Sequence, residues 1–173
     1  MSGIRTNKIK EKLNQGSITT TLMGIANADQ VDQLGPANFD GVWIEAEHGG
    51  TDYGEISDLT RACDLWSKTS ITRVNQNEPG VIYRTLDRGS QGICVPHVNT
   101  KTEAEAVVEA AKFAPIGNRG MFTSRQGYGV DNYFLQANNQ TLLIILIEDI
   151  KAIENLEEIL TVDHIDVFFV APN

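Results

Sequence analysis

The sequence has few of the features that mark secreted, membrane or disulfide-rich proteins. It has only two cysteines, Cys63 and Cys94, and without a secretory signal two cysteines indicate free thiols in a reducing compartment. The first sixteen residues are polar and lack the apolar core of a signal peptide. The longest apolar run, residues 142–147, is far too short to span a bilayer. We therefore expect a cytoplasmic protein with no membrane partner.

Basic residues are also in deficit. Lys and Arg total 14 against 23 Asp and Glu, so the net charge is -9. This balance argues against nucleic acid as a partner, because phosphate neutralisation needs clustered Lys and Arg. It does not exclude a small anionic substrate, since a metal ion and one buried arginine can dominate a local field. The length of 173 residues and the hydrophobic fraction of 41% suit one globular domain over residues 1–173.

What the sequence does have is a regular alternation of short apolar runs and helix-like stretches. The pattern predicts strands at residues 18–24, 39–46, 69–74, 91–98, 141–148 and 165–170, with a further short strand after Arg119. It predicts helices at residues 28–35, from Asp52 to about Trp66, from Pro79 to Arg88, from Thr100 or Thr102, at 130–139 and at 151–160. Such βαβα alternation indicates a parallel sheet covered by helices.

Two ways of winding this sheet compete, the doubly wound sheet and the TIM (β/α)₈ barrel. No Gly-rich phosphate loop follows the first strand, which weakens the dinucleotide-binding form of the doubly wound sheet. Polar residues instead gather where strands end, at Glu45, Glu47, His48, Arg73, His97 and Glu148. Site residues supplied by several strand ends are typical of a TIM barrel. The seven predicted strands are one short of a closed barrel, so we expect the chain to be truncated before an eighth strand.

Three of these polar residues carry specific chemical expectations. His48 follows a strand in the sequence EHGG, where it suits proton transfer, although a hydrogen-bonded loop histidine is the alternative. Arg73 lies in an apolar strand, so it needs either a structural carboxylate or an anionic ligand. Glu148 ends the most apolar stretch, where an unpaired carboxylate is costly, so it needs a cation or several hydrogen-bond donors, for example a salt bridge with Arg73.

Other candidates are weaker. His97 lies at a strand end and is a candidate for shaping the pocket. His164 precedes the last strand, on the stability face, and is expected to be structural. Cys94 falls inside a strand and is expected to pack in the core.

Several segments, taken in order, resemble the HpcH/HpaI aldolase family, which includes 4-hydroxy-2-oxoheptanedioate and 2-dehydro-3-deoxyglucarate aldolases. They are WIEAEH at 43–48, TRVNQNEP at 72–79, LDRG at 86–89, VP at 95–96, APIGNRG at 114–120 and IE at 147–148. The resemblance runs from about Asn7 to Asn173, nearly the whole chain. The ordered series is specific, whereas any single piece is weak.

The resemblance implies roles for individual residues. His48 would be the catalytic acid/base, with Asp87 as its carboxylate partner. Arg73 would be catalytic and substrate-binding, contacting the 2-oxo group and stabilising the enolate oxygen.

The same resemblance implies a divalent metal site. Glu148 would be a ligand of Mg²⁺ or Mn²⁺, with Co²⁺ or Zn²⁺ as alternatives, and a second carboxylate is expected just after Asn173. Asn173 itself would bind substrate. Glu45 and Glu47 would lie near the metal-bound waters, although the family commonly has aspartate at position 45.

The function implied is that of a class II aldolase, a carbon–carbon lyase that joins pyruvate to an aldehyde or reverses that reaction, in a homo-oligomer, typically a hexamer. A Schiff-base mechanism is rejected because no lysine falls in a predicted strand. One alternative is a related barrel lyase of the malyl-CoA or citramalyl-CoA type. Another is a catalytically degenerate barrel with a binding or assembly role, which is favoured by Leu146, where family members often have glutamine.

Overall fold

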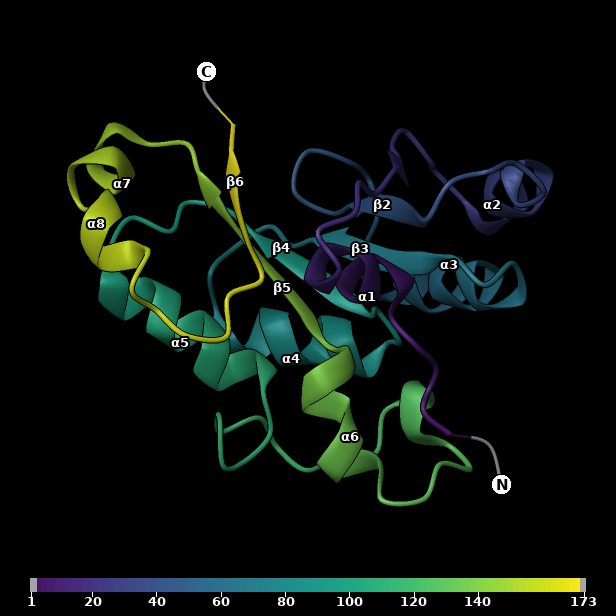
Figure 1. Ribbon diagram of the computed structural model, residues 1–173. Helices are drawn as coiled ribbons and strands as arrows, with labels where there is room; N and C mark the ends of the chain where they lie inside the picture. Colours follow the sequence, from purple (N-terminus) through teal and green to yellow (C-terminus); the bar gives the residue numbers. More distant parts are fainter. Residues whose placement is uncertain (1–2, 172–173) are drawn as a thin grey trace.

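A computed structural model describes residues 3–171 of the chain. Six strands form one sheet: β1 (Thr21–Leu22), β2 (Gly41–Glu45), β3 (Thr69–Arg73), β4 (Gly92–Val95), β5 (Leu142–Ile147) and β6 (Val167–Val170). All neighbouring strands are parallel, and their order in the sheet is their order in the sequence. This order, in a sheet that curls as Figure 1 shows, is that of a partial TIM-like barrel, and it excludes the doubly wound alternative, in which the strand order reverses.

Most helices connect successive strands and cover the outer face of the sheet, whereas the first helix packs against its inner face (Figure 1). They are α1 (Lys8–Asn14), α2 (Ala28–Leu34), α3 (Tyr53–Leu65), α4 (Pro79–Asp87), α5 (Lys101–Ala111), α6 (Tyr133–Gln140), α7 (Ile150–Glu154) and α8 (Leu156–Ile159), with a 3₁₀ turn, η1 (Arg125–Gly127). The Asp52 cap and the Pro79 start are confirmed, and Thr100 rather than Thr102 caps α5. The single helix predicted at 151–160 is two short helices, and α1 was not predicted at all.

The prediction of seven strands is wrong for the described residues. The expected short strand after Arg119 does not form, because β4 pairs directly with β5 and leaves no gap for it. The segment after Arg119 instead crosses the surface, where Met121 and Phe122 are exposed. Residues 112–132 thus make a long connection from α5 to α6 with only η1 as regular structure.

Strand alternation gives the sheet two apolar faces. Trp43, Ile71, Cys94, Ile144 and Leu146 form the cluster on the inner, concave face, and α1 adds Ile9 to it. The neighbouring positions face outward and pack under α3, α4 and α5 in two larger clusters. Glu45 and Arg73 share the side of Trp43 and Ile71, so the same alternation points both into the concave side at the carboxyl ends of β2 and β3.

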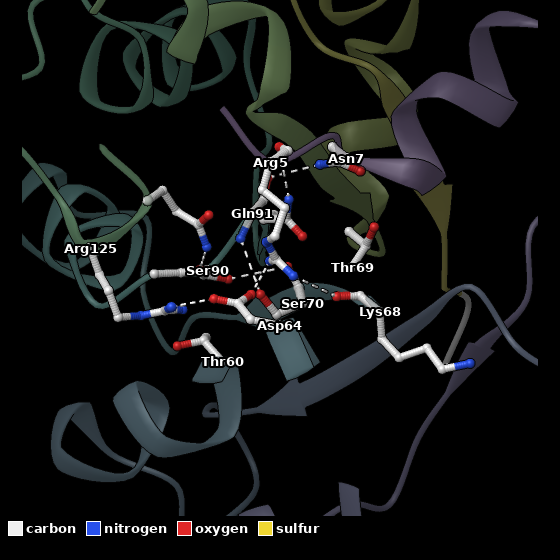
Figure 2. A network of polar contacts seen from close by, with 12 residues as sticks. Arg5, Asn7, Thr60, Asp64, Lys68, Thr69, Ser70, Ser90, Gln91 and Arg125 are labelled. Atoms are coloured by element: carbon white, nitrogen blue, oxygen red, sulfur yellow. Dashed lines mark hydrogen bonds and ion pairs between the residues drawn. The ribbon is translucent and has the colours of Figure 1, made fainter. Parts of the chain in front are cut away.

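A network of polar contacts closes the opposite, amino-terminal edge of the sheet (Figure 2). Asp64, at the end of α3, pairs with both Arg5 and Arg125, and Asn7 donates a hydrogen bond to the Gln91 carbonyl at 3.0 Å. The Asp64 pairs connect the end of α3 to the segment before α1 and to η1, and the Asn7 bond connects the start of α1 to the residue before β4. The ion pairs at the amino-terminal edge therefore have a structural role, so a catalytic site is expected at the carboxyl edge.

Candidate active site

The carboxyl edge of the sheet gathers the charged residues that the sequence singled out. Arg73 donates from Nε to both oxygens of Glu45, at 3.0 and 2.8 Å, and its Nη1 lies 3.0 Å from Oε2 of Glu47. Both glutamates therefore point toward Arg73. The two carboxylates compensate the guanidinium, so Arg73 is held in place before any ligand arrives.

Glu45 organises the turn that carries His48. Its Oε1 accepts hydrogen bonds from the backbone N–H groups of Glu47 at 2.9 Å and His48 at 3.1 Å, and its Oε2 accepts from Trp43 Nε1 at 3.2 Å. Burial raises the pKa of this carboxyl, but the bond from Arg73 and the backbone donors together hold its pKa below the usual value. Glu45 is therefore an ionised, fully occupied acceptor with a structural role.

Glu47 lies between two imidazoles. Its side chain is only 9% exposed, with Oε2 at 3.6 Å from His48 Nε2 and Oε1 at 3.7 Å from His97 Nε2. The charge of Glu47 is compensated on one side by Arg73, whose Nη1 lies 3.0 Å from Oε2. Its carboxylate therefore links Arg73 to the two imidazoles of the site.

His48 projects from this edge with its side chain 75% exposed. The glycine that follows is needed for the turn, because a Cβ at Gly49 would lie 2.6 Å from the backbone oxygen of Glu45. Gly50 has open space around it. Of the two glycines that follow His48, only Gly49 is therefore required by a close backbone approach.

Asp87 does not meet His48 within this chain. It lies at the end of α4 and accepts a hydrogen bond from Arg119 Nη2 at 2.6 Å. Because helices run antiparallel to the strands, the end of α4 lies at the amino-terminal edge of the sheet, opposite to His48. The expected His48–Asp87 contact is therefore not formed among residues 3–171.

Glu148 follows β5 with its side chain 11% exposed. Its Oε1 accepts a hydrogen bond from the backbone N–H of His97 at 2.8 Å. The expected alternative, a salt bridge to Arg73, is not formed, and within residues 3–171 no Lys or Arg pairs with this carboxylate. Leu146, on the inner face below it, is 1% exposed.

His97 lies among three carboxylates of the site, those of Glu47, Glu148 and Asp149. Its Nδ1 is 3.1 Å from Oδ2 of Asp149, and Asn99 donates to the same oxygen at 3.0 Å. The bond to Asp149 raises the pKa of His97, with smaller increases from the charges of Glu148, Asp149 and Glu47, and burial opposes them. Asp149 and Asn99 were missed by sequence reasoning, although a helix-starting Asp directly after a strand was an available signal.

Cys94 and His164 lie where they were expected. Cys94 is buried in the inner cluster, and burial raises the pKa of its thiol. His164 is exposed ahead of β6, away from the carboxyl edge. Asn173 lies outside the described residues.

The donor set fits a divalent metal ion in part. Within residues 3–171 no group of three or more His, Cys, Asp or Glu is arranged to hold a metal ion. Glu148 nevertheless offers a largely buried carboxylate that has no Lys or Arg partner within residues 3–171. Hard oxygen donors of this kind suit Mg²⁺ or Mn²⁺.

A singly wound parallel sheet with its charged residues gathered at the carboxyl edge defines a partial (β/α) barrel with its site in the usual place. The chain belongs to the HpcH/HpaI aldolase/citrate lyase family, whose model matches residues 22–173. Among residues 3–171, each helix is too short or too polar to span a lipid bilayer.

The proteins most useful for comparison are aldolases and a solved structure from the same family. The chain is 34% identical over 171 residues to a hydroxypyruvate/pyruvate aldolase of Roseobacter denitrificans, covering 96% of this chain and 67% of that protein. It is also 34% identical to a 2-dehydro-3,6-dideoxy-6-sulfogluconate aldolase of Pseudomonas putida, covering 93% and 64%. A family member from Burkholderia cenocepacia superimposes with a TM-score of 0.88 at 25% identity, covering 95% of this chain and 68% of that one. The chain thus spans about two thirds of the length of its relatives.

Proposed function

We propose that the protein is a class II aldolase, which cleaves or forms a carbon–carbon bond between pyruvate and an aldehyde. Family membership supports the reaction class, and the aldolase relatives support a 2-oxo acid substrate. The observation that carries the proposal is the carboxyl-edge cluster, in which Arg73, His48 and the buried Glu148 share one site.

Glu148, together with a carboxylate expected just after Asn173, would hold the metal ion. A divalent cation supplies Lewis-acid polarisation of the carboxylate and oxo oxygens of a 2-oxo acid. Glu148 suits this chemistry because, within residues 3–171, no Lys or Arg pairs with its carboxylate.

Arg73 would bind the 2-oxo group. Its guanidinium is held by Glu45 and Glu47, so it needs no reorganisation when negative charge develops on the oxo oxygen. It would therefore stabilise the enolate more strongly than the ground-state ketone.

His48 would move the proton. In the cleavage direction its imidazole accepts the proton of the 4-hydroxyl, the C4–O bond becomes a carbonyl, and the C3–C4 bond breaks with its electron pair passing to the enolate. Protonation at C3 then gives pyruvate, and the aldehyde leaves. The exposure of the His48 ring leaves it free to reach the substrate in this way.

Metal dependence is the first test. Full-length protein incubated with pyruvate and short hydroxylated aldehydes should form aldol products that are measurable by chromatography. EDTA should abolish product formation, and Mg²⁺ or Mn²⁺ in excess should restore it. Aldol formation that survives exhaustive chelation would contradict the class II assignment.

A further inference from the structure

One residue of the carboxyl edge has a backbone conformation that its sequence position does not explain. His97 has φ of 55°, the left-handed region, between two buried residues, Pro96 and Val98. Non-glycine residues in this region are uncommon, and they persist where the surrounding structure requires them, often at functional sites. The consequence here is geometric, because the turn aims the His97 N–H at Glu148 Oε1, 2.8 Å away.

The turn is held from the other side by the loop that carries Glu148. Asp149 Oδ2 accepts from Asn99 Nδ2 at 3.0 Å and lies 3.1 Å from His97 Nδ1. Asn155, after α7, donates to the Asn99 carbonyl at 2.9 Å. The loops after β4 and β5 are thus joined by one backbone bond to Glu148 and a set of side-chain bonds around it.

We propose that the left-handed turn at His97 is a positioning device for Glu148: its backbone N–H holds one carboxylate oxygen, which orients the other toward a divalent cation. The inference rests on the proposed metal dependence. His97 acts through Glu148 and is a positioning residue, and the essential part is the backbone conformation rather than the imidazole. Partners that orient a metal-binding carboxylate typically change metal affinity about 10- to 100-fold when they are lost.

Two substitutions of His97 distinguish the effect of its backbone conformation from the effect of its imidazole ring. His97→Gly removes the imidazole but favours the left-handed conformation, so the N–H stays in place. His97→Ile also removes the imidazole, and its β-branched side chain disfavours that conformation. A matched control is His164→Ile, since His164 is a second exposed histidine in the left-handed region, with φ of 68°, away from the carboxyl edge.

The experiment is Mn²⁺ binding by calorimetry on full-length protein, with thermal melting as the folding check. We expect His97→Gly to keep wild-type affinity within about threefold, and His97→Ile to lose about tenfold or more. His164→Ile should lower the melting temperature, as His97→Ile does, without changing Mn²⁺ affinity. Equal affinity in both His97 variants, whether wild-type or weakened, overturns the proposal.

A second variant keeps the test decisive if His97→Ile does not fold. Asn99→Ala removes one hydrogen bond to Asp149 and leaves all charges in place. It should therefore weaken Mn²⁺ binding about threefold or more. Unchanged binding would contradict the proposed positioning role of the His97 turn. Absence of Mn²⁺ binding in the wild-type protein would instead refute the metal dependence itself. The two failures are therefore distinguishable.

Discussion

At the scale of single residues, the site is defined by which charges are compensated. Arg73 is balanced by Glu45 and Glu47, whereas Glu148 has only a backbone donor and a neighbouring imidazole. This asymmetry separates a preorganised anion-binding arginine from a carboxylate that is suited to a cation. Side-chain alternation in β2 and β3 brings Glu45 and Arg73 to the same side of the sheet, whereas Glu148 reaches the site from the end of β5.

The proposed acid/base role of His48 can be tested by substitution. The His48→Ala variant should have an aldol turnover about 10²–10⁴-fold lower, which is the usual contribution of a positioned proton-transfer group. Mn²⁺ affinity should change little, because His48 is not proposed as a ligand. Steady-state kinetics and calorimetry measure both quantities.

The matched control is His164→Ala, which removes an exposed histidine far from the carboxyl edge. This variant should retain wild-type turnover. Full turnover in His48→Ala would restore the reading of His48 as a hydrogen-bonded loop histidine.

At the scale of elements, the sequence predicted most helices and strands and failed where long-range contacts decide. The caps at Asp52 and Thr100 are local, and both form complete capping boxes. The strand expected after Arg119 failed because its place in the sheet is already filled by β5. Within residues 3–171 Asp87 pairs with Arg119, 32 residues away, a contact that no local pattern encodes, and its role as the partner of His48 stays a prediction.

The connection after α5 offers a test of element packing. A Cβ at Gly117 would lie 2.5 to 2.9 Å from the backbone oxygens of Lys112, Val108 and Glu109, the last carbonyls of the helix. Gly117→Ala should therefore lower the free energy of unfolding by about 1–3 kcal/mol through overpacking. Urea unfolding monitored by circular dichroism measures this change.

Gly120, three residues further on, is the control. A Cβ there meets nothing within 4 Å, so Gly120→Ala should be neutral or slightly stabilising. Equal destabilisation by both substitutions would show that the connection does not pack on the end of α5 as described.

At the scale of the whole molecule, the amino-terminal edge is a network of buried polar contacts and the concave side is apolar. A cavity of about 250 Å³ lies on the concave side, lined by residues of β1, β2, β5 and β6, among them Trp43, Ile144 and Phe169. Phe169 is 44% exposed and Val170 is 62% exposed at the edge strand β6.

Lys112, at the amino-terminal edge, should make the stability of the protein depend on pH. It is 2% exposed and donates to the carbonyls of Asn138 at 2.8 Å and Thr141 at 2.7 Å. Burial, with a further contribution from the charge of Lys10, lowers the pKa of Lys112 to about 7. In the unfolded chain a lysine has a pKa of about 10.4, so above pH 7 the unfolded state binds more protons and stability rises with pH.

Between pH 7 and pH 8.5 this linkage should raise the free energy of unfolding by about 1–2 kcal/mol. The same rise should be missing in Lys112→Met, measured by urea unfolding at both pH values. The range stops at pH 8.5 because burial raises the pKa of Cys63 to about 12, so thiol ionisation in the unfolded chain opposes stability at higher pH. A rise of equal size in the variant would contradict a neutral Lys112.

The central claim, metal-dependent formation of a pyruvate enolate, can be measured without knowing the aldehyde. Full-length protein in D₂O with Mg²⁺ should exchange the methyl protons of pyruvate for deuterium, seen as loss of the methyl signal in the proton NMR spectrum. EDTA should stop the exchange, and renewed Mg²⁺ should restart it. Exchange that continues under EDTA, or no exchange with Mg²⁺ and Mn²⁺ both supplied, would contradict the assignment.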